Sequence, residues 1–256
     1  MSEERFFRDW PAHKRKAAVA LVPGLAEHSG RYEHVAGRLN DAGYSVVAVD
    51  IRGHGRSAGW PGMIEGLDDW VADARAVLER GRAAAGVRPL FLMGHSLGAL
   101  IAATYVVRAG GDGLAGLVLS SLAVLAGPAI LESMGDPEGQ GIPSTALSRD
   151  VEVQRAYDQD PLVFADRVPP ESTAAALEAA IEVNQGTGLI ALPVLMFHGE
   201  LDAIADPEGA RYFFEALAST DKRLRIYDGL LHETMNEPEQ DEVLDDLVAW
   251  LDEHAP

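Results

Sequence analysis

The chain has 256 residues, 47% of them hydrophobic, and a formal net charge of −19. This length and apolar content can bury one sizeable core, so we expect a single α/β domain that carries an insertion. Nucleic acid and anionic membrane surfaces repel such a charge, which argues against both as principal partners. The chain has no cysteine, which excludes disulfides and cysteine-based metal or nucleophile sites.

The N-terminal segment is charged throughout, and no apolar run of signal-peptide length follows it. No stretch of the chain reaches the roughly 20 apolar residues that a membrane span needs. We therefore expect a cytoplasmic protein.

Short apolar runs alternate with amphipathic segments in the first half of the chain. Continuous apolar runs are typical of strands buried on both faces of a parallel sheet. We expect strands at residues 17–22, 45–49, 90–93 and 114–119, with a short edge strand at residues 6–10. Helical periodicity follows in residues 32–39, 67–78 and 97–105. This alternation predicts a doubly wound, mostly parallel sheet with helices on both faces.

The alternation stops in residues 122–190, where Pro and Gly interrupt helical candidates at 149–157 and 172–183. It then resumes with strands at 194–197 and 224–227 and helices at 207–217 and 244–251. We interpret residues 122–190 as a cap, or lid, inserted between two parts of the core, residues 1–121 and 191–256. The apolar piece at 122–134 would either line an acyl channel or pack the lid on the body.

Residues 94–98 form a G-x-S-x-G pattern around Ser96, where an expected strand turns into a helix. A serine nucleophile needs a turn so sharp that the flanking positions have no room for side chains. The amide of Leu97, at the start of the helix, would point at the oxygen that becomes negative during acyl transfer. A glycine-flanked serine in an ordinary turn is the alternative, but the surrounding strand and helix favour a nucleophile.

A serine nucleophile also needs a base, and the base needs an anion that orients it. Asp202 and His232 each follow an expected strand, so both would lie with Ser96 at the carboxyl edge of the sheet. The chain order Ser96, Asp202, His232 is the order of the α/β-hydrolases. The acidic alternatives to Asp202 are Glu200, Asp206 and Asp228.

The remaining motifs carry less chemistry. We expect His28 and His54 to bind backbone near the strand ends and His198 to be structural. An H-E-x-x-H metal motif is incomplete because Asn236 stands four residues after His232, and no phosphate-binding G-x-x-x-x-G-K is present. We therefore expect no metal and no cofactor.

From about residue 17 to residue 251, the chain resembles the monoacylglycerol lipase and lysophospholipase branch of the α/β-hydrolase superfamily, which is serine aminopeptidase S33-like. The resemblance is carried by GLAEHSGRY (24–32), DIRGHGRS (50–57), GHSLG (94–98), HGELD (198–202) and IYDGLLHE (226–233). DPLV (160–163) is similar to the lid sequence of the family. The resemblance implies an α/β-hydrolase fold with a helical cap.

The resemblance also implies roles for single residues. Ser96 would be the nucleophile, His232 the general base and then acid, and Asp202 its orienting anion. The backbone amides of Leu25 and Leu97 would form the oxyanion hole.

Glu27 and Arg31 would lie near a glycerol headgroup, or would form an ion pair that shapes their loop. Two positions depart from the family. Pro23 replaces the usual His before Gly24, and Met235 stands where mammalian members carry a second headgroup His.

We expect a serine ester hydrolase that cleaves small-molecule acyl esters, monoacylglycerols or lysophospholipids, through an acyl-enzyme. Contact with membranes or micelles would be at most transient and made through the cap. The alternatives are a short-chain carboxylesterase, a thioesterase, an acyltransferase, a small aminopeptidase, or a hydrolase fold that binds a ligand without turnover.

Overall fold

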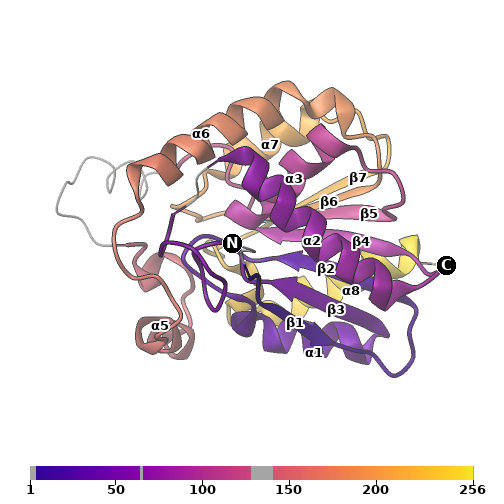
Figure 1. Cartoon of the computed structure of the whole chain (residues 1–256), viewed down its shortest axis with the longest axis horizontal. Helices are drawn as coiled ribbons and strands as arrows, with labels where there is room; N and C mark the ends of the chain where they lie inside the picture. Colours follow the sequence, from indigo (N-terminus) through magenta and orange to yellow (C-terminus); the bar gives the residue numbers. More distant parts are fainter. Residues whose placement is uncertain (1–3, 64–65, 128–140, 256) are drawn as a thin grey trace.

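The computed structural model describes residues 4–63, 66–127 and 141–255. Seven strands of these residues form one sheet in the order β1-β3-β2-β4-β5-β6-β7 (Figure 1). β1 runs antiparallel to β3, and the other neighbouring pairs are parallel. The strands are β1 (Phe7–Trp10), β2 (Ala17–Val22), β3 (Tyr44–Val49), β4 (Leu90–His95), β5 (Gly116–Ser120), β6 (Val194–Gly199) and β7 (Lys222–Tyr227).

Helices join most of the strands. The α-helices described are α1 (Glu33–Asp41), α2 (Leu67–Ala85), α3 (Leu97–Ala109), α5 (Val151–Gln159), α6 (Pro170–Gln185), α7 (Pro207–Ala216) and α8 (Gln240–His254). Short 3-10 turns are η1 (Ser29–Tyr32), η2 (Ser144–Ala146), η3 (Thr187–Leu189) and η4 (Thr234–Asn236). Within the described ranges, none of the helices has the length and apolar character required to cross a membrane.

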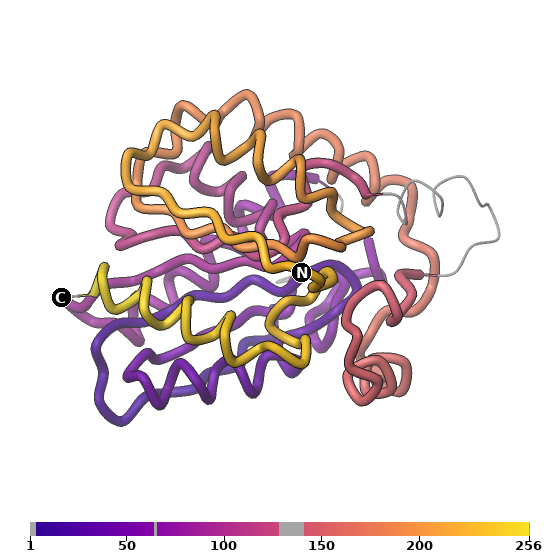
Figure 2. The backbone as a smooth tube through the Cα atoms, turned by 180° about the vertical axis from the view of Figure 1, so that it is seen from behind, coloured from indigo at the N-terminus to yellow at the C-terminus, as the bar shows by residue number. Residues whose placement is uncertain are grey.

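The sheet separates two apolar cores. On one face, α2, α3, α6 and α7 pack over side chains such as Ala18 and Ala20 of β2. On the other face, α1 and α8 cover the alternate residues of the same strand, Val19 and Leu21 (Figures 1 and 2). Because successive strand residues point to opposite faces, β2 is apolar throughout and fully buried. The arrangement confirms the expected doubly wound sheet.

The expected strands and helices are confirmed. Most bounds differ by four residues or fewer, but α2 continues seven residues beyond the expected segment, to Ala85. β7 begins two residues before its apolar run, at Lys222. Its burial alternates because it is an edge strand with one face toward solvent, so the apolar pattern marks only part of it. The expected edge strand at residues 6–10 is β1.

The segment between β5 and β6 lies in two places. α6 packs along α3 on one flank of the sheet, whereas η2 and α5 lie beyond the ends of the strands (Figures 1 and 2). Leu147 and Tyr157 hold this second part to Ile204 in a small apolar cluster of their own. Of the apolar piece expected to line a channel, Leu122 and Val124 are buried in the main core, and residues 128–134 lie outside the described residues.

Candidate active site

Ser96 lies on the turn between β4 and α3 with φ 53° and ψ −118°, a left-handed conformation that is strained for a residue with a side chain. The flanking glycines are required by contact. A Cβ on Gly94 would collide with the carbonyl of Gly98, and one on Gly98 would collide with the carbonyl of Val22. The chain thus folds into the expected sharp turn, and Leu97 begins α3 directly after Ser96.

His232 and Asp202 meet in a buried hydrogen bond. Nδ1 of His232 lies 2.7 Å from Oδ2 of Asp202, although the two residues are 30 positions apart. His232 belongs to the loop after β7, residues 228–233, which we call the base loop. Ser121, after β5, donates from its hydroxyl to the His232 carbonyl at 2.6 Å. Because Nδ1 donates to Asp202, Nε2 of His232 is left to accept a proton.

Asp202 is held by four donors. Its Oδ1 accepts the amides of Ile204 and Ala205 at 2.9 and 3.0 Å. Its Oδ2 accepts His232 and also lies 2.9 Å from Nε2 of His198. Burial raises the pKa of Asp202, but the charge of His232 and the hydrogen bonds from both histidines outweigh it and hold that pKa well below its usual range. The carboxylate therefore stays ionised.

The same surroundings act on His232 in the opposite direction. Burial lowers its pKa, but the charge of Asp202, their hydrogen bond and the charge of Glu233 raise it above its ordinary value. The ring of His232 lies 4.9 Å from that of His95, the residue before Ser96. Among the described residues, Ser96 makes no hydrogen bond to His232. Such contacts often tighten only when substrate is bound.

The loop after β2, residues 23–26, lies against Ser96, and we call it the oxyanion loop. A Cβ on Gly24 would stand 3.2 Å from that of Ser96. Within the described part of the chain, the amides of Leu25 and Leu97 donate to no backbone carbonyl. Pro23 leaves both amides in place, since only its own N–H is missing.

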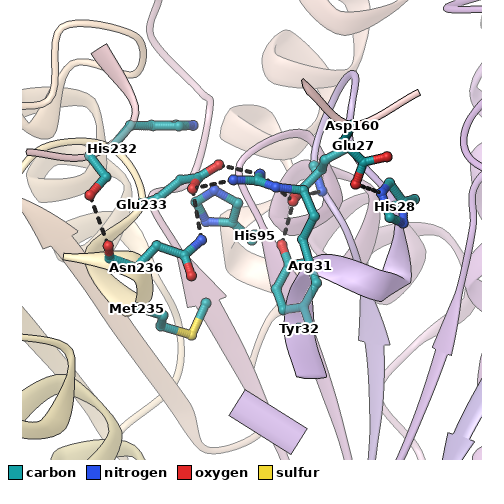
Figure 3. Close-up of polar contacts among 12 residues, drawn as sticks. Glu27, His28, Arg31, Tyr32, His95, Asp160, His232, Glu233, Met235 and Asn236 are labelled. Carbon is teal, nitrogen blue, oxygen red and sulfur yellow. Dashed lines mark hydrogen bonds and ion pairs between the residues drawn. The ribbon is translucent and has the colours of Figure 1, made fainter. Parts of the chain in front are cut away.

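Glu27 and Arg31 form an ion pair, and a second carboxylate joins them (Figure 3). Nη1 of Arg31 lies 3.0 Å from Glu27 and 2.5 Å from Glu233, and Nη2 lies 2.8 Å from the other oxygen of Glu233. The other oxygen of Glu27, Oε1, accepts hydrogen bonds from the Tyr32 hydroxyl at 2.6 Å and from the Gly24 amide at 2.5 Å. Glu27 and Arg31, the two residues expected near a headgroup, are therefore bonded to each other.

The pKa values of the two carboxyls that pair with Arg31 shift in opposite directions. Burial raises the pKa of Glu27, and the neighbouring Glu233 adds to this effect against the opposing charge of Arg31. For Glu233, the charge and hydrogen bonds of Arg31 outweigh burial and lower its pKa to about 2. Asn236 donates to Glu233 at 2.7 Å, and the ring of Tyr157 lies 4.9 Å from the Arg31 guanidinium.

Two contacts join the segment after α5 to the loop after β2. Nε2 of His28 donates to Asp160 at 2.9 Å, because its Nδ1 accepts the amide of Gly30. The amide of Phe164 donates to the carbonyl of Ala26 at 2.8 Å. His28 therefore bonds a backbone amide, as expected, and in addition bonds Asp160, which was not expected. His54 bonds a backbone carbonyl, as expected.

The acidic alternatives to Asp202 have other contacts. Glu200 accepts the amide of Gly229, Asp206 caps α7 by accepting the amide of Glu208, and Asp228 is exposed. Among the described residues, no group of three His, Cys, Asp or Glu side chains is placed to hold a metal ion.

Sequence reasoning missed Glu233, Asp160 and Tyr157 as neighbours of the site, and it gave His198 no contact with Asp202. The available signals were the position of Glu233 directly after His232 and the place of Asp160 in the DPLV segment. The partners of the other residues are far apart in sequence, such as Asp160 and His28 at 132 positions.

Comparison with known proteins shows the family to which the chain is similar. The family model described as serine aminopeptidase, S33 matches residues 13–239. The chain is 36% identical to a monoacylglycerol lipase of Mycolicibacterium smegmatis, over 93% of this chain and 89% of the relative. It is 31% identical to the monoglyceride lipase of Homo sapiens, over 89% and 79%. The crystal structure of the Paleococcus ferrophilus monoacylglycerol lipase superimposes with a TM-score of 0.85 at 31% identity, covering 98% of this chain and 99% of that one.

Proposed function

This chain belongs to the serine aminopeptidase S33 family, in the monoacylglycerol lipase branch of the α/β-hydrolases. We propose that it hydrolyses single-chain acyl esters and that monoacylglycerols are its principal substrates. The observation that carries the proposal is the buried hydrogen bond of 2.7 Å between His232 and Asp202, beside a serine on a strained turn. Relatives named as monoacylglycerol and monoglyceride lipases support the substrate class.

Each residue of the proposed triad has one role. Ser96 Oγ attacks the ester carbonyl while Nε2 of His232 takes its proton, and Asp202 stabilises the imidazolium that forms. The amides of Leu25 and Leu97 stabilise the oxyanion. His232 then gives the proton to the leaving glycerol oxygen, which leaves an acyl-enzyme on Ser96.

A water molecule completes the cycle. His232 removes its proton as it attacks the acyl-enzyme, and Ser96 recovers a proton from His232 when the fatty acid leaves. The reaction consumes one water and one ester and yields one alcohol and one acid. The chain's own groups supply every proton transfer in this scheme.

We also propose that residues 122–190 act as the cap and that contact with a lipid surface is transient and made there. Exposed Leu177 and Ile181 on α6 and exposed Val151 on α5 support such contact. The charge of −19 disfavours lasting adsorption to anionic lipid.

A panel of p-nitrophenyl esters from acetyl to palmitoyl, with 1-monoacylglycerols and lysophosphatidylcholine, tests the proposal on the native protein and on Ser96→Ala. We expect preference for chains of about eight carbons or more, since each buried methylene contributes about 0.8 kcal/mol. Turnover should disappear in Ser96→Ala. Cleavage of acetyl or butyryl esters alone would indicate a short-chain esterase, and failure of a fluorophosphonate to label the folded protein would indicate a binding protein.

A further inference from the structure

We propose that Glu233, Arg31 and Glu27 form a buried clamp that holds the oxyanion loop in register with the base loop, and that Glu233 is a positioning residue for catalysis. The inference rests on the ester hydrolysis proposed above. It assigns a role to a carboxylate that the triad does not use, directly beside the residue proposed as general base.

The clamp is a continuous chain of hydrogen bonds (Figure 3). Both carboxylate oxygens of Glu233 accept from the two terminal nitrogens of Arg31, at 2.5 and 2.8 Å. Arg31 continues to Glu27 at 3.0 Å, and Glu27 accepts the amide of Gly24 at 2.5 Å. A side chain next to His232 is thereby connected to the backbone of the oxyanion loop.

The connection is stiff because of its geometry and its burial. The Arg31 side chain is 9% exposed and both carboxylates are 4% exposed. A guanidinium fork paired with both oxygens of a carboxylate fixes distance and orientation together, which a single ammonium cannot do. Removal of one charged partner leaves another buried without full compensation, so the remaining groups must rearrange.

The contacts favour a positioning role over direct contact with a headgroup. Both terminal nitrogens of Arg31 are already bonded to carboxylates, and the ring of Tyr157 lies over its guanidinium. Glu27 Oε1 is likewise bonded to Tyr32 and Gly24. Three of the five N–H groups of the Arg31 guanidinium are thereby bonded to carboxylates, which leaves little of it for a substrate hydroxyl.

Movement of the clamp would be transmitted to the reacting atoms. A Cβ on Gly24 would stand 3.2 Å from that of Ser96, and the proposed Leu25 amide is the next one along the chain. A displacement of about 1 Å in groups of this kind can cost on the order of a hundredfold in rate. The clamp therefore acts through the oxyanion hole.

Two esters with the same acyl chain distinguish a positioning role of the clamp from direct binding of a headgroup. p-Nitrophenyl octanoate and 1-monooctanoylglycerol share the acyl group, but only the second carries a glycerol headgroup. In Glu233→Gln we expect kcat to fall about tenfold to a hundredfold on both esters, with KM within about twofold. The rate of fluorophosphonate labelling of Ser96 should fall by a similar factor.

The matched control is Glu182→Gln. Glu182 also makes a two-point pair with an arginine, Arg108, at 2.5 and 2.6 Å, but it lies between α6 and α3 away from the site. In Glu182→Gln, kcat on both esters and the rate of fluorophosphonate labelling should stay within about twofold of the native values. Thermal unfolding of each variant shows whether it is folded at the assay temperature.

Each outcome decides between the roles. A native protein that hydrolyses neither ester overturns the proposed function, and the clamp with it. A native protein that is active while Glu233→Gln is unchanged overturns the clamp alone, as does a rise in KM confined to the monoacylglycerol. If Glu233→Gln does not fold, Arg31→Lys keeps the charge without the fork and should show the same loss of kcat on both esters.

Discussion

Nε2 of His198 lies 2.9 Å from Oδ2 of Asp202, the oxygen that also accepts the hydrogen bond of His232. Nε2 is also 2.9 Å from the carbonyl of Ala205, so it must carry the ring proton. His198 is 1% exposed and its Nδ1 has no partner among the described residues. The Nε2–H of His198 is therefore shared between the Ala205 carbonyl and the oxygen of the proposed triad anion that also accepts from His232.

His198→Phe should lower kcat about tenfold, because Asp202 loses one of its four donors and is held less firmly against His232. With less of its charge offset, Asp202 should also raise the pKa of His232 further and move the acid limb of kcat/KM to higher pH. Profiles from pH 5 to 9 measure both effects. His198→Gln, whose amide can donate, is the control and should recover most of the activity. An unchanged profile in His198→Phe would show that His198 only fills space.

Ser96→Gly should abolish turnover and yet be more stable than Ser96→Ala. The φ of 53° at Ser96 costs on the order of 1–3 kcal/mol for a residue with a Cβ, and glycine relieves it at an entropic cost of about 0.5–1 kcal/mol. We expect a net gain of about 1 kcal/mol over Ser96→Ala, which keeps the Cβ and lacks the hydroxyl. Urea unfolding of the two variants makes the comparison, and a less stable Ser96→Gly would contradict the strain.

The sequence predicted most of the fold because the buried strands are unbroken apolar runs and the turns that follow them carry distinct motifs. Ser96, Asp202 and His232 could be assigned to one edge of the sheet because each follows a parallel strand. The flanking glycines of Ser96 could be explained in advance because their requirement is local and steric.

The contacts between loops could not be predicted in this way. Arg31 and Glu233 are 202 positions apart, and which carboxylate meets the guanidinium depends on how the two loops pack. Sequence reasoning therefore offered a loop-shaping ion pair of Arg31 with Glu27 as one of two interpretations, and it missed Glu233. The contact of His198 with Asp202 was missed for a related reason, because the direction of a side chain after a strand is set by the turn that follows.

The raised pKa of His232 predicts the pH dependence of the enzyme. Its pKa lies above the ordinary value of 6.5, and His232 must be neutral if it is to accept the Ser96 proton as proposed. kcat/KM should therefore fall as the pH decreases through a midpoint above 6.5. His95 adds no second limb, since burial and the charge of His232 lower its pKa to about 3.

Asp202→Asn tests the cause of that midpoint. Loss of the negative charge should lower the pKa of His232 and move the midpoint to lower pH, with kcat reduced by on the order of 10⁴-fold. NMR titration of the imidazoles follows the pKa even where turnover is too slow to measure. A midpoint that moves upward in this variant would show that Asp202 is not the charge that raises it.

The same substitution, glycine to alanine, should have opposite effects at Gly98 and Gly37. A Cβ on Gly98 would collide with the carbonyls of Val22 and Pro23, so α3 and the oxyanion loop would have to separate, at a cost of about 3 kcal/mol or more. A Cβ on Gly37, in the exposed face of α1, meets nothing within 4 Å, and alanine there should stabilise the helix by about 0.5–1 kcal/mol. Thermal and urea unfolding of both variants, with fluorophosphonate labelling of Ser96, measure the contrast. If Gly98→Ala were as stable and as reactive as native, the close approach of α3 to the end of β2 would not be what holds the nucleophile beside the oxyanion loop.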